Sequence, residues 1–224
     1  MPLIFLTAAM AVIVLASNIL VQFPVSGFIG NVALGDILTW GAFTYPVAFL
    51  VTDMTNRAFG PNMARRVVFS GFIVAVLASF IVPPLLYRWG LIGFETEFAR
   101  LQRIAIASGL AFLGGQLLDV TLFNKLREAM WWKAPIIGSL FGSALDTVLF
   151  FSLAFAAAFT IIGPVDPFAS ESAPLLGVYT IELPRWISWA AGDFGVKLII
   201  AAIALVPYRL FMDRLGFWQA QVKT

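Results

Sequence analysis

Four ionisable side chains interrupt long apolar stretches of this sequence, and they are the residues best placed to do chemistry. They are Asp119, Asp146, Asp193 and Lys197. A charged side chain at the centre of a bilayer costs at least about 2.5 kcal/mol on insertion scales, so each is by default a candidate for function. Asp193 and Lys197 are four residues apart, which places them on one helix face where they can pair. Their ion pair could be purely structural, or one of the two could exchange partners as the protein works.

Gln116 and Asp119 are three residues apart and therefore also share a helix face. Together they offer two carboxylate oxygens, an amide oxygen and an amide NH2 group. This array suits an amidine-like or guanine-like edge, in which two parallel N–H groups bind one carboxylate. The alternative is a hydrogen bond between neighbouring helices. We favour a binding site, because an amide would suffice for packing.

Asp146 lies near the middle of a run that also contains Gly138 and Gly142, each four residues apart. Small residues at this spacing let two helix backbones approach closely. Tight packing alone explains the two glycines. It does not explain the aspartate, because packing has no need of a charge.

Three further residues complete the candidate site. Asn18 and Gln22 lie on one face late in the first apolar run, and Tyr45 lies in the middle of the second. Pro46, which follows Tyr45, removes one backbone hydrogen bond and can kink a helix. The Tyr45 ring could stack on a flat ligand, although an aromatic side chain here could equally face lipid or the protein core.

Six apolar runs must position these residues. They cover roughly 3–23, 36–52, 67–87, 104–123, 134–162 and 187–211. Apolar residues make up 61% of the chain and charged residues only 12%, about half the charge of a soluble domain. The runs are continuous and about twice as long as barrel strands, so they predict helices. We therefore expect an all-α membrane protein with six transmembrane helices, forming a single integral membrane domain over residues 1–224.

Basic residues predict the orientation, because cytoplasmic loops are enriched in Lys and Arg. One side would hold nine of them: Arg57, Arg65, Arg66, Lys125, Arg127, Lys133, Arg209, Arg214 and Lys223. The other side would hold four: Arg88, Arg100, Arg103 and Arg185. This asymmetry places both termini in the cytoplasm, and that placement requires an even number of spans.

The composition also excludes several kinds of function. The chain has no cysteine and no histidine, which excludes disulfides and Cys or His metal sites. The net charge of +2 is too small to indicate nucleic acid as a partner. Few groups remain for covalent chemistry, so the sequence favours a carrier of a small polar molecule over an enzyme. No cofactor is expected.

Short motifs along most of the chain resemble one known family. They include Ser17-Asn-Ile-Leu-Val-Gln-Phe-Pro-Val25, Thr39-Trp-Gly-Ala-Phe43, Thr52-Asp-Met-Thr-Asn-Arg57, Gly115-Gln-Leu-Leu-Asp119, Trp131-Trp132, Leu140-Phe-Gly142, Asp146-Thr147, and Asp193 with Lys197. The match runs from about residue 17 to residue 200, and the order and spacing of the motifs together are specific. The pattern resembles the bacterial queuosine precursor transporter family, also called the VUT family.

The resemblance implies a multi-pass inner-membrane importer of 7-deazaguanine bases for the queuosine modification of tRNA. The expected substrate is 7-cyano-7-deazaguanine (preQ0), with its 7-aminomethyl relative as a second candidate. The resemblance also implies a six-helix fold similar to the S-components of energy-coupling-factor transporters. Gln116, Asp119, Asp146, Asp193 and Lys197 would then line a central polar cavity, in which Asp119 or Asp146 holds the guanine edge.

Two other readings of the sequence stay open. The chain could be an S-component-like binding subunit for a vitamin or nucleobase that needs a partner ATPase, or a membrane enzyme or scaffold without transport activity. The sequence also leaves open whether copies form a homo-oligomer. The 163–186 loop is expected outside, as a linker rather than a lid, and its Gly and Pro content argues against a helix of its own.

Overall fold

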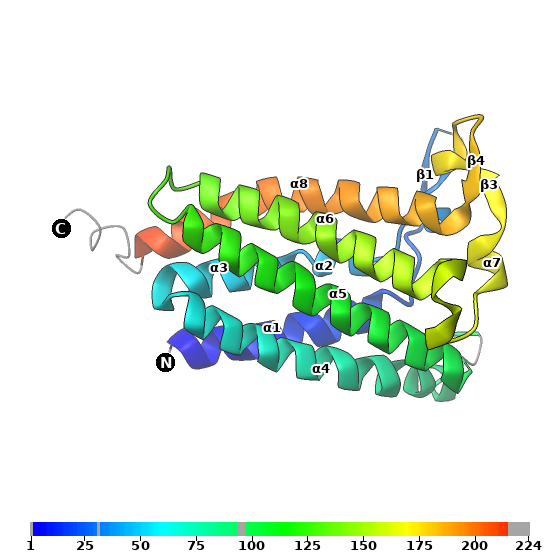
Figure 1. Cartoon of the computed structure of the whole chain (residues 1–224), viewed down its shortest axis with the longest axis horizontal. Helices are drawn as coiled ribbons and strands as arrows, with labels where there is room; N and C mark the ends of the chain where they lie inside the picture. Colours follow the sequence, from blue (N-terminus) through cyan, green and yellow to red (C-terminus); the bar gives the residue numbers. More distant parts are fainter. Residues whose placement is uncertain (1, 31, 94–96, 215–224) are drawn as a thin grey trace.

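Five long helices lie side by side in the computed structural model, which describes residues 2–30, 32–93 and 97–214 (Figure 1). They are α1 (Pro2–Leu20), α4 (Pro61–Arg88), α5 (Phe98–Lys125), α6 (Lys133–Phe155) and α8 (Arg185–Arg214). Within the described residues, these five helices are long and apolar enough to cross a membrane. The shortest, α1, has 19 residues, close to the about 20 needed to span the hydrocarbon core. The predicted helical membrane class is confirmed.

The second apolar run is not one continuous helix. It forms a short α2 (Gly41–Thr44) and a longer α3 (Val47–Phe59), separated at Tyr45 and Pro46, where the regular hydrogen-bond ladder is interrupted although both residues keep helical dihedral angles. Proline has no N–H to continue the helical ladder, so the break falls where the kink was expected. The expected end at residue 52 is wrong, because α3 continues for two more turns to Phe59.

The remaining short elements lie at the end of the bundle opposite the start of α1 (Figure 1). They are β1 (Phe28–Ile29), β2 (Val32–Ala33), η1 (Leu34–Asp36), η2 (Ala157–Ile162), α7 (Pro167–Ser170), β3 (Ser172–Pro174), η3 (Leu175–Gly177) and β4 (Glu182–Pro184). Strands β1 and β2 pair antiparallel, as do β3 and β4.

Two expectations about this end are corrected. The fifth run was expected to extend to residue 162, but its α-helix stops at Phe155 and a 3-10 helix follows. The 163–186 loop does contain a helix, the one-turn α7. Asp166 caps α7 by accepting a hydrogen bond from the Ala169 amide at 3.2 Å, and Pro167 occupies the first helical position.

Helices α5 and α6 form the most extensive helix pair of the described chain. Glycines allow this approach: a Cβ added at Gly115 would lie 2.8 Å from the Gly142 carbonyl oxygen and 2.8 Å from the Asp146 Cβ. The predicted close backbone contact in the 138–146 stretch is therefore confirmed, and its partner is α5.

Replacing Gly115 by alanine should destabilise the fold. The new methyl group would collide with the Gly142 backbone, which cannot rotate away, and such overpacking typically costs about 1–3 kcal/mol. Thermal unfolding of the purified protein in detergent would measure the loss. Gly195→Ala on α8 is the matched control, because its Cβ would meet nothing within 4 Å. Equal melting temperatures for the two variants would contradict the close contact between Gly115 and the Gly142 backbone.

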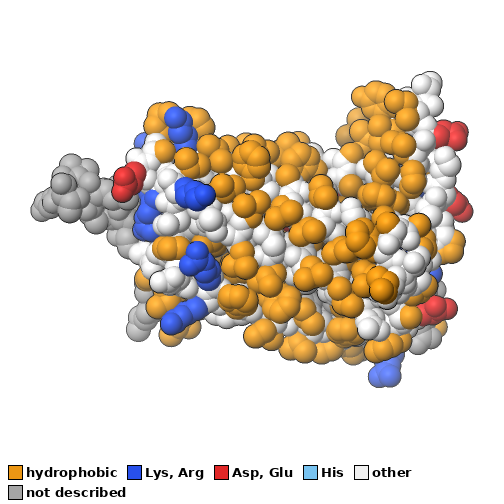
Figure 2. All heavy atoms as spheres, in the orientation of Figure 1, with side chains coloured by type: hydrophobic (Ala, Val, Ile, Leu, Met, Phe, Trp, Pro, Cys, Tyr) orange, Lys and Arg blue, Asp and Glu red, His pale blue; other side chains and the backbone are white. Residues whose placement is uncertain are grey.

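The surface divides into a middle belt and two ends (Figure 2). Hydrophobic side chains cover the belt, and residues such as Ile73, Leu77, Ile199 and Ile203 are more than half exposed there. Lys and Arg side chains gather at the end where α1 begins and α8 ends, whereas acidic side chains gather mainly at the opposite end. Of the nine basic residues assigned to one side, Lys223 lies outside the described residues.

Candidate functional site

A closed network of charges joins α6, α8 and the break before α3. We call it the lysine cluster: Tyr45, Asp146, Thr147, Asp193 and Lys197. The Lys197 Nζ lies 2.6 Å from Asp146 Oδ2 and 2.5 Å from Asp193 Oδ2, and it donates to Thr147 Oγ1 at 3.0 Å. An ammonium group has three N–H donors, so these three acceptors satisfy it. The predicted pairing of Asp193 with Lys197 is confirmed.

Two hydroxyl groups complete the lysine cluster. The Tyr45 hydroxyl donates to Asp146 Oδ1 at 2.8 Å, and Thr147 Oγ1 donates to Asp193 Oδ2 at 3.0 Å. Both oxygens of Asp146 therefore have partners within the protein. The Tyr45 ring also lies 5.2 Å from the Lys197 ammonium group. Tyr45 thus contributes a hydrogen bond and a cation–π contact in place of the expected free stacking surface.

In contrast to the lysine cluster, helix α5 carries buried polar atoms that lack hydrogen-bond partners among the described residues. Both carboxyl oxygens of Asp119 and the Nε2 of Gln116 have no hydrogen-bond partner among the described residues. The exposed fraction of each side chain is 0%. The other amide atom, Gln116 Oε1, accepts from Thr52 Oγ1 at 2.5 Å. We call Gln116 and Asp119 the α5 pair.

A second incompletely bonded carboxyl group faces the α5 pair from α3. Asp53 Oδ2 accepts a long hydrogen bond of 3.5 Å from Ser139 on α6, and Asp53 Oδ1 has no partner. Asp119 lies against Gly138, the residue before Ser139, because a Cβ added there would collide with the Asp119 carboxyl group. The two carboxyl groups therefore contact consecutive residues of α6, close enough for their charges to interact.

Three polar residues, Asp53, Asn56 and Arg57, continue α3 beyond residue 52, where the second apolar run was expected to end. All three are buried within α3, with exposed fractions of 2%, 0% and 4%. Sequence reasoning missed them because the apolar run ends at Thr52, and a polar helix face packed inside a protein has the composition of a loop. The spacing of Thr52, Asn56 and Asp53 along one helix was the available signal.

Arg57 links α3 to α8 and to the segment after α5 near the basic end of the bundle. Its Nε donates to the Tyr208 hydroxyl at 2.9 Å and its Nη1 to the Arg127 carbonyl at 2.7 Å, while Arg127 Nη2 donates to the Arg57 carbonyl at 2.6 Å. Burial, with the neighbouring charge of Arg57 as a second cause, lowers the pKa of Arg127 from its ordinary value.

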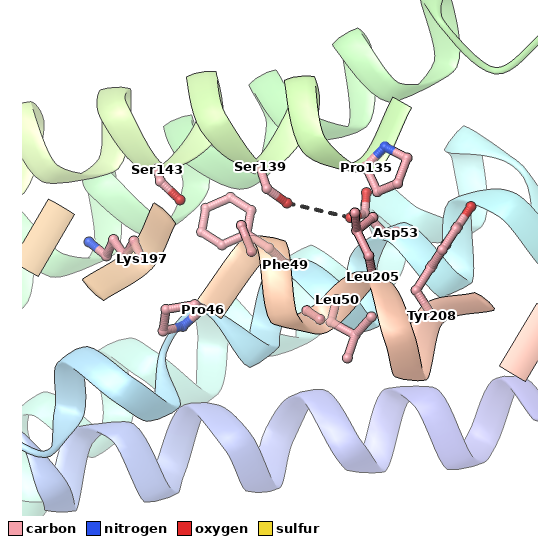
Figure 3. A pocket seen from close by; sticks show the side chains of 12 residues that line it. Pro46, Phe49, Leu50, Asp53, Pro135, Ser139, Ser143, Lys197, Leu205 and Tyr208 are labelled. Carbon is pink, nitrogen blue, oxygen red and sulfur yellow. Dashed lines mark hydrogen bonds between the residues drawn. The ribbon is translucent and has the colours of Figure 1, made fainter. Parts of the chain in front are cut away.

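A small cavity lies between the lysine cluster and Asp53. Its volume is about 10 Å3, room for roughly one water molecule. Figure 3 shows Lys197 toward one end and Asp53 toward the other, with Ser143, Phe49 and Ser139 between them. This cavity is not the expected chamber shared by Asp119 and Asp146: neither residue lines it, and of the predicted site residues only Lys197 does.

Phe49 lies beside both the cavity and the α5 pair. Its side chain lines the cavity, and its ring also approaches Gly142, where an added Cβ would lie 2.7 Å from the Phe49 ring and 3.1 Å from the Asp119 Cβ. Nothing in the sequence distinguishes this phenylalanine from the other 21.

The structure does not bring Asn18 and Gln22 together with the other predicted residues. Asn18 accepts a hydrogen bond from Ser79 on α4 at 3.1 Å and donates to the Val14 carbonyl. Gln22 lies just beyond the end of α1. Neither side chain has a described hydrogen bond to the lysine cluster or to the α5 pair.

Comparisons with known proteins cover most of the chain. A family model described as "Putative vitamin uptake transporter" matches residues 39–211, a range that contains both the lysine cluster and the α5 pair. The queuosine precursor transporter of Escherichia coli (strain K12) is 37% identical over 199 residues, covering 87% of this chain and 79% of that protein. The probable queuosine precursor transporter of Haemophilus influenzae is 38% identical over 205 residues, with the same coverage. No solved structure matches the chain.

Proposed function

The chain belongs to the queuosine precursor transporter family, and on this premise we propose that it imports a 7-deazaguanine base across the bacterial inner membrane. The base is 7-cyano-7-deazaguanine, with 7-aminomethyl-7-deazaguanine as the second candidate, and the imported base would serve the queuosine modification of tRNA. The names of the relatives support a queuosine precursor as cargo. The apolar belt and the buried polar interior support a route through a bilayer.

One observation carries the choice of a guanine-type edge: the unpartnered atoms of the α5 pair match it atom by atom. A 7-deazaguanine presents two donors, N1–H and the exocyclic NH2, beside one acceptor, O6. Asp119 offers two acceptor oxygens, and Gln116 offers an Nε2 donor one turn earlier on the same helix. A buried polar group without a partner costs about 1–3 kcal/mol, and more when charged, so a ligand that pairs these atoms recovers that free energy.

The same reasoning selects Asp119 over Asp146 as the residue that holds the base. Both oxygens of Asp146 are already bonded, to Lys197 and to Tyr45. A ligand could take Asp146 only by breaking an ion pair buried in the protein. The lysine cluster is therefore assigned a supporting role: it ties α6, α8 and Tyr45 together beside the cavity. Asn18 and Gln22 are left out of the proposed site.

The base can enter only if the cavity enlarges. A space for one water molecule does not hold a two-ring base, and Phe49 lies beside both this space and Asp119. Displacing the Phe49 side chain would join the two. The ring would then be free to stack on the base, so that Phe49, rather than Tyr45, supplies the flat aromatic surface.

We further propose six membrane crossings with both termini in the cytoplasm. The broken α2–α3 segment would be the second crossing. Two observations support this arrangement: α1 begins and α8 ends at the same end of the bundle, and Lys and Arg gather there, as expected of a cytoplasmic face.

Purified protein in liposomes tests the proposed function directly. We expect saturable uptake of labelled 7-cyano-7-deazaguanine without ATP or any partner protein. Unlabelled 7-deazaguanine should compete, whereas 7-deazaadenine should not, because its edge presents the wrong donors and acceptors to the α5 pair. Binding without uptake, relieved only by an added ATPase complex, would instead indicate a binding subunit. Failure to bind or transport the base at all would contradict the proposal.

A further inference from the structure

We propose that Asp53 binds a proton that crosses the membrane together with the base, which makes the protein a proton-coupled importer. This inference rests on the proposed function, because it names the ion that drives it. It concerns a residue that the base-binding site does not use, and it starts from the poor compensation of the Asp53 carboxyl group.

Asp53 is too weakly solvated to hold a negative charge easily. Its side chain is 2% exposed, Oδ1 has no hydrogen-bond partner among the described residues, and Oδ2 has only the 3.5 Å contact from Ser139. An ionised carboxylate removed from water without compensation is costly, and protonation relieves that cost.

Both cations and acids lie around Asp53. Arg57, one turn later on α3, bonds to the Tyr208 hydroxyl and the Arg127 carbonyl, and its charge also acts on Asp53. From α8, Lys197 lines the same cavity, but its three N–H donors are taken by the lysine cluster. Ser139 on α6 is neutral, and α5 contributes a second acid, Asp119. The charge of Asp119 acts on Asp53 more strongly than the charge of Arg57 does.

The proximity of the two acids links the proton to the base. Asp119 must be ionised to accept two N–H bonds from a guanine edge. Two neighbouring carboxylates in a dry site cannot both ionise cheaply, so one of them holds a proton. Ionised Asp119 with bound base thus favours protonated Asp53. Linkage is reciprocal, so a proton on Asp53 strengthens base binding by the same factor.

The cavity gives the Asp53 carboxyl group a neighbouring site for a water molecule, which can exchange a proton with it. Asp53, Ser139, Ser143 and Tyr208 line the cavity, which has room for about one water molecule. In the transport cycle an outside proton binds the Asp53 carboxylate as an O–H group. It leaves again as a proton on the cytoplasmic side when the base departs. One neutral base and one positive charge cross in each cycle.

Proteoliposomes loaded with a trapped pH dye test this coupling. With the membrane potential held at zero by potassium and valinomycin and the outside one pH unit more acidic, the wild-type protein should accumulate labelled base about ten-fold, the limit for one proton per base. The dye should report acidification of the interior when base is added outside. A sodium gradient at equal pH should produce no accumulation.

Asp53→Asn should separate coupling from transport. The amide mimics the neutral acid, so this variant should exchange labelled for unlabelled base within two-fold of the wild-type rate. It should not accumulate base under a pH gradient, and it should move no protons. Asp213→Asn, whose side chain is 52% exposed at the end of α8, is the matched control and should accumulate base like the wild type.

Each outcome decides one question. Base exchange by the wild-type protein without any response to the pH gradient would overturn the proton proposal and leave transport intact. So would accumulation driven by sodium, or pH-driven accumulation by Asp53→Asn. Neither exchange nor uptake by the wild-type protein would overturn the proposed function itself. If Asp53→Asn does not fold, the wild-type accumulation and dye measurements still decide the coupling.

Discussion

Asp119→Asn is expected to weaken binding of the base at least about 100-fold, because charge-assisted hydrogen bonds contribute about 1.5–3 kcal/mol each and the variant removes the charge from two. The asparagine also turns one acceptor into an NH2 donor that faces an N–H group of the base. Labelled-base binding to purified protein measures the affinity. Queuosine in tRNA of cells that cannot make the base, supplied with trace amounts of it, measures the consequence.

The stability of Asp119→Asn distinguishes a binding residue from a structural one. The Asp119 carboxyl group has no hydrogen-bond partner in the described protein, so replacing it should leave the melting temperature unchanged or raise it. A binding residue that costs stability is a common trade-off. A strong loss of stability would assign Asp119 to packing. Normal binding by Asp119→Asn, with loss in Asp146→Asn, would move the base to the lysine cluster.

Lys197→Met should be the most destabilising substitution in the membrane interior. It leaves two buried carboxylates, Asp146 and Asp193, without the ammonium group that pairs with both. Removing one partner of a buried ion pair typically costs about 3–5 kcal/mol. We expect little folded protein on size-exclusion chromatography in detergent, and a large fall in melting temperature for what remains.

A charge-neutral variant provides the rescue for Lys197→Met. Combining it with Asp146→Asn and Asp193→Asn removes the unpaired charges and should restore most of the folded yield. Lys125→Met, at an exposed position at the end of α5, should behave like the wild type. A Lys197→Met protein as stable as the wild type would show that the lysine cluster does not hold α6 and α8 together.

Hydropathy and spacing predict much of this molecule. The long helices follow from apolar runs, and the pairing of Asp193 with Lys197 follows from a four-residue interval on one helix. Both are local properties. The binding partners Asp146 and Tyr45 are 51 and 152 residues away from Lys197 along the chain, and only tertiary packing brings them to it.

The residues that the sequence hides share one property: their roles depend on the protein groups they contact, and their residue type alone does not reveal those contacts. Asp53 follows the last apolar residues of its run and therefore resembles a loop residue by composition. Phe49 resembles any other membrane phenylalanine until its position beside a cavity and Asp119 is seen. The size of the cavity is equally invisible in a sequence, because it depends on the fit of side chains from three helices.

The interruption at Pro46 affects how α3 can move. A proline that interrupts the hydrogen-bond ladder is a common site of helix bending, so α3 can bend relative to α2 at this position. The 13 residues of α3 include Phe49, which lies beside the cavity, Thr52, which bonds to Gln116, and Asp53. Bending at this position would therefore move the Phe49 ring, the hydrogen bond from Thr52 to Gln116 and the Asp53 carboxyl group together.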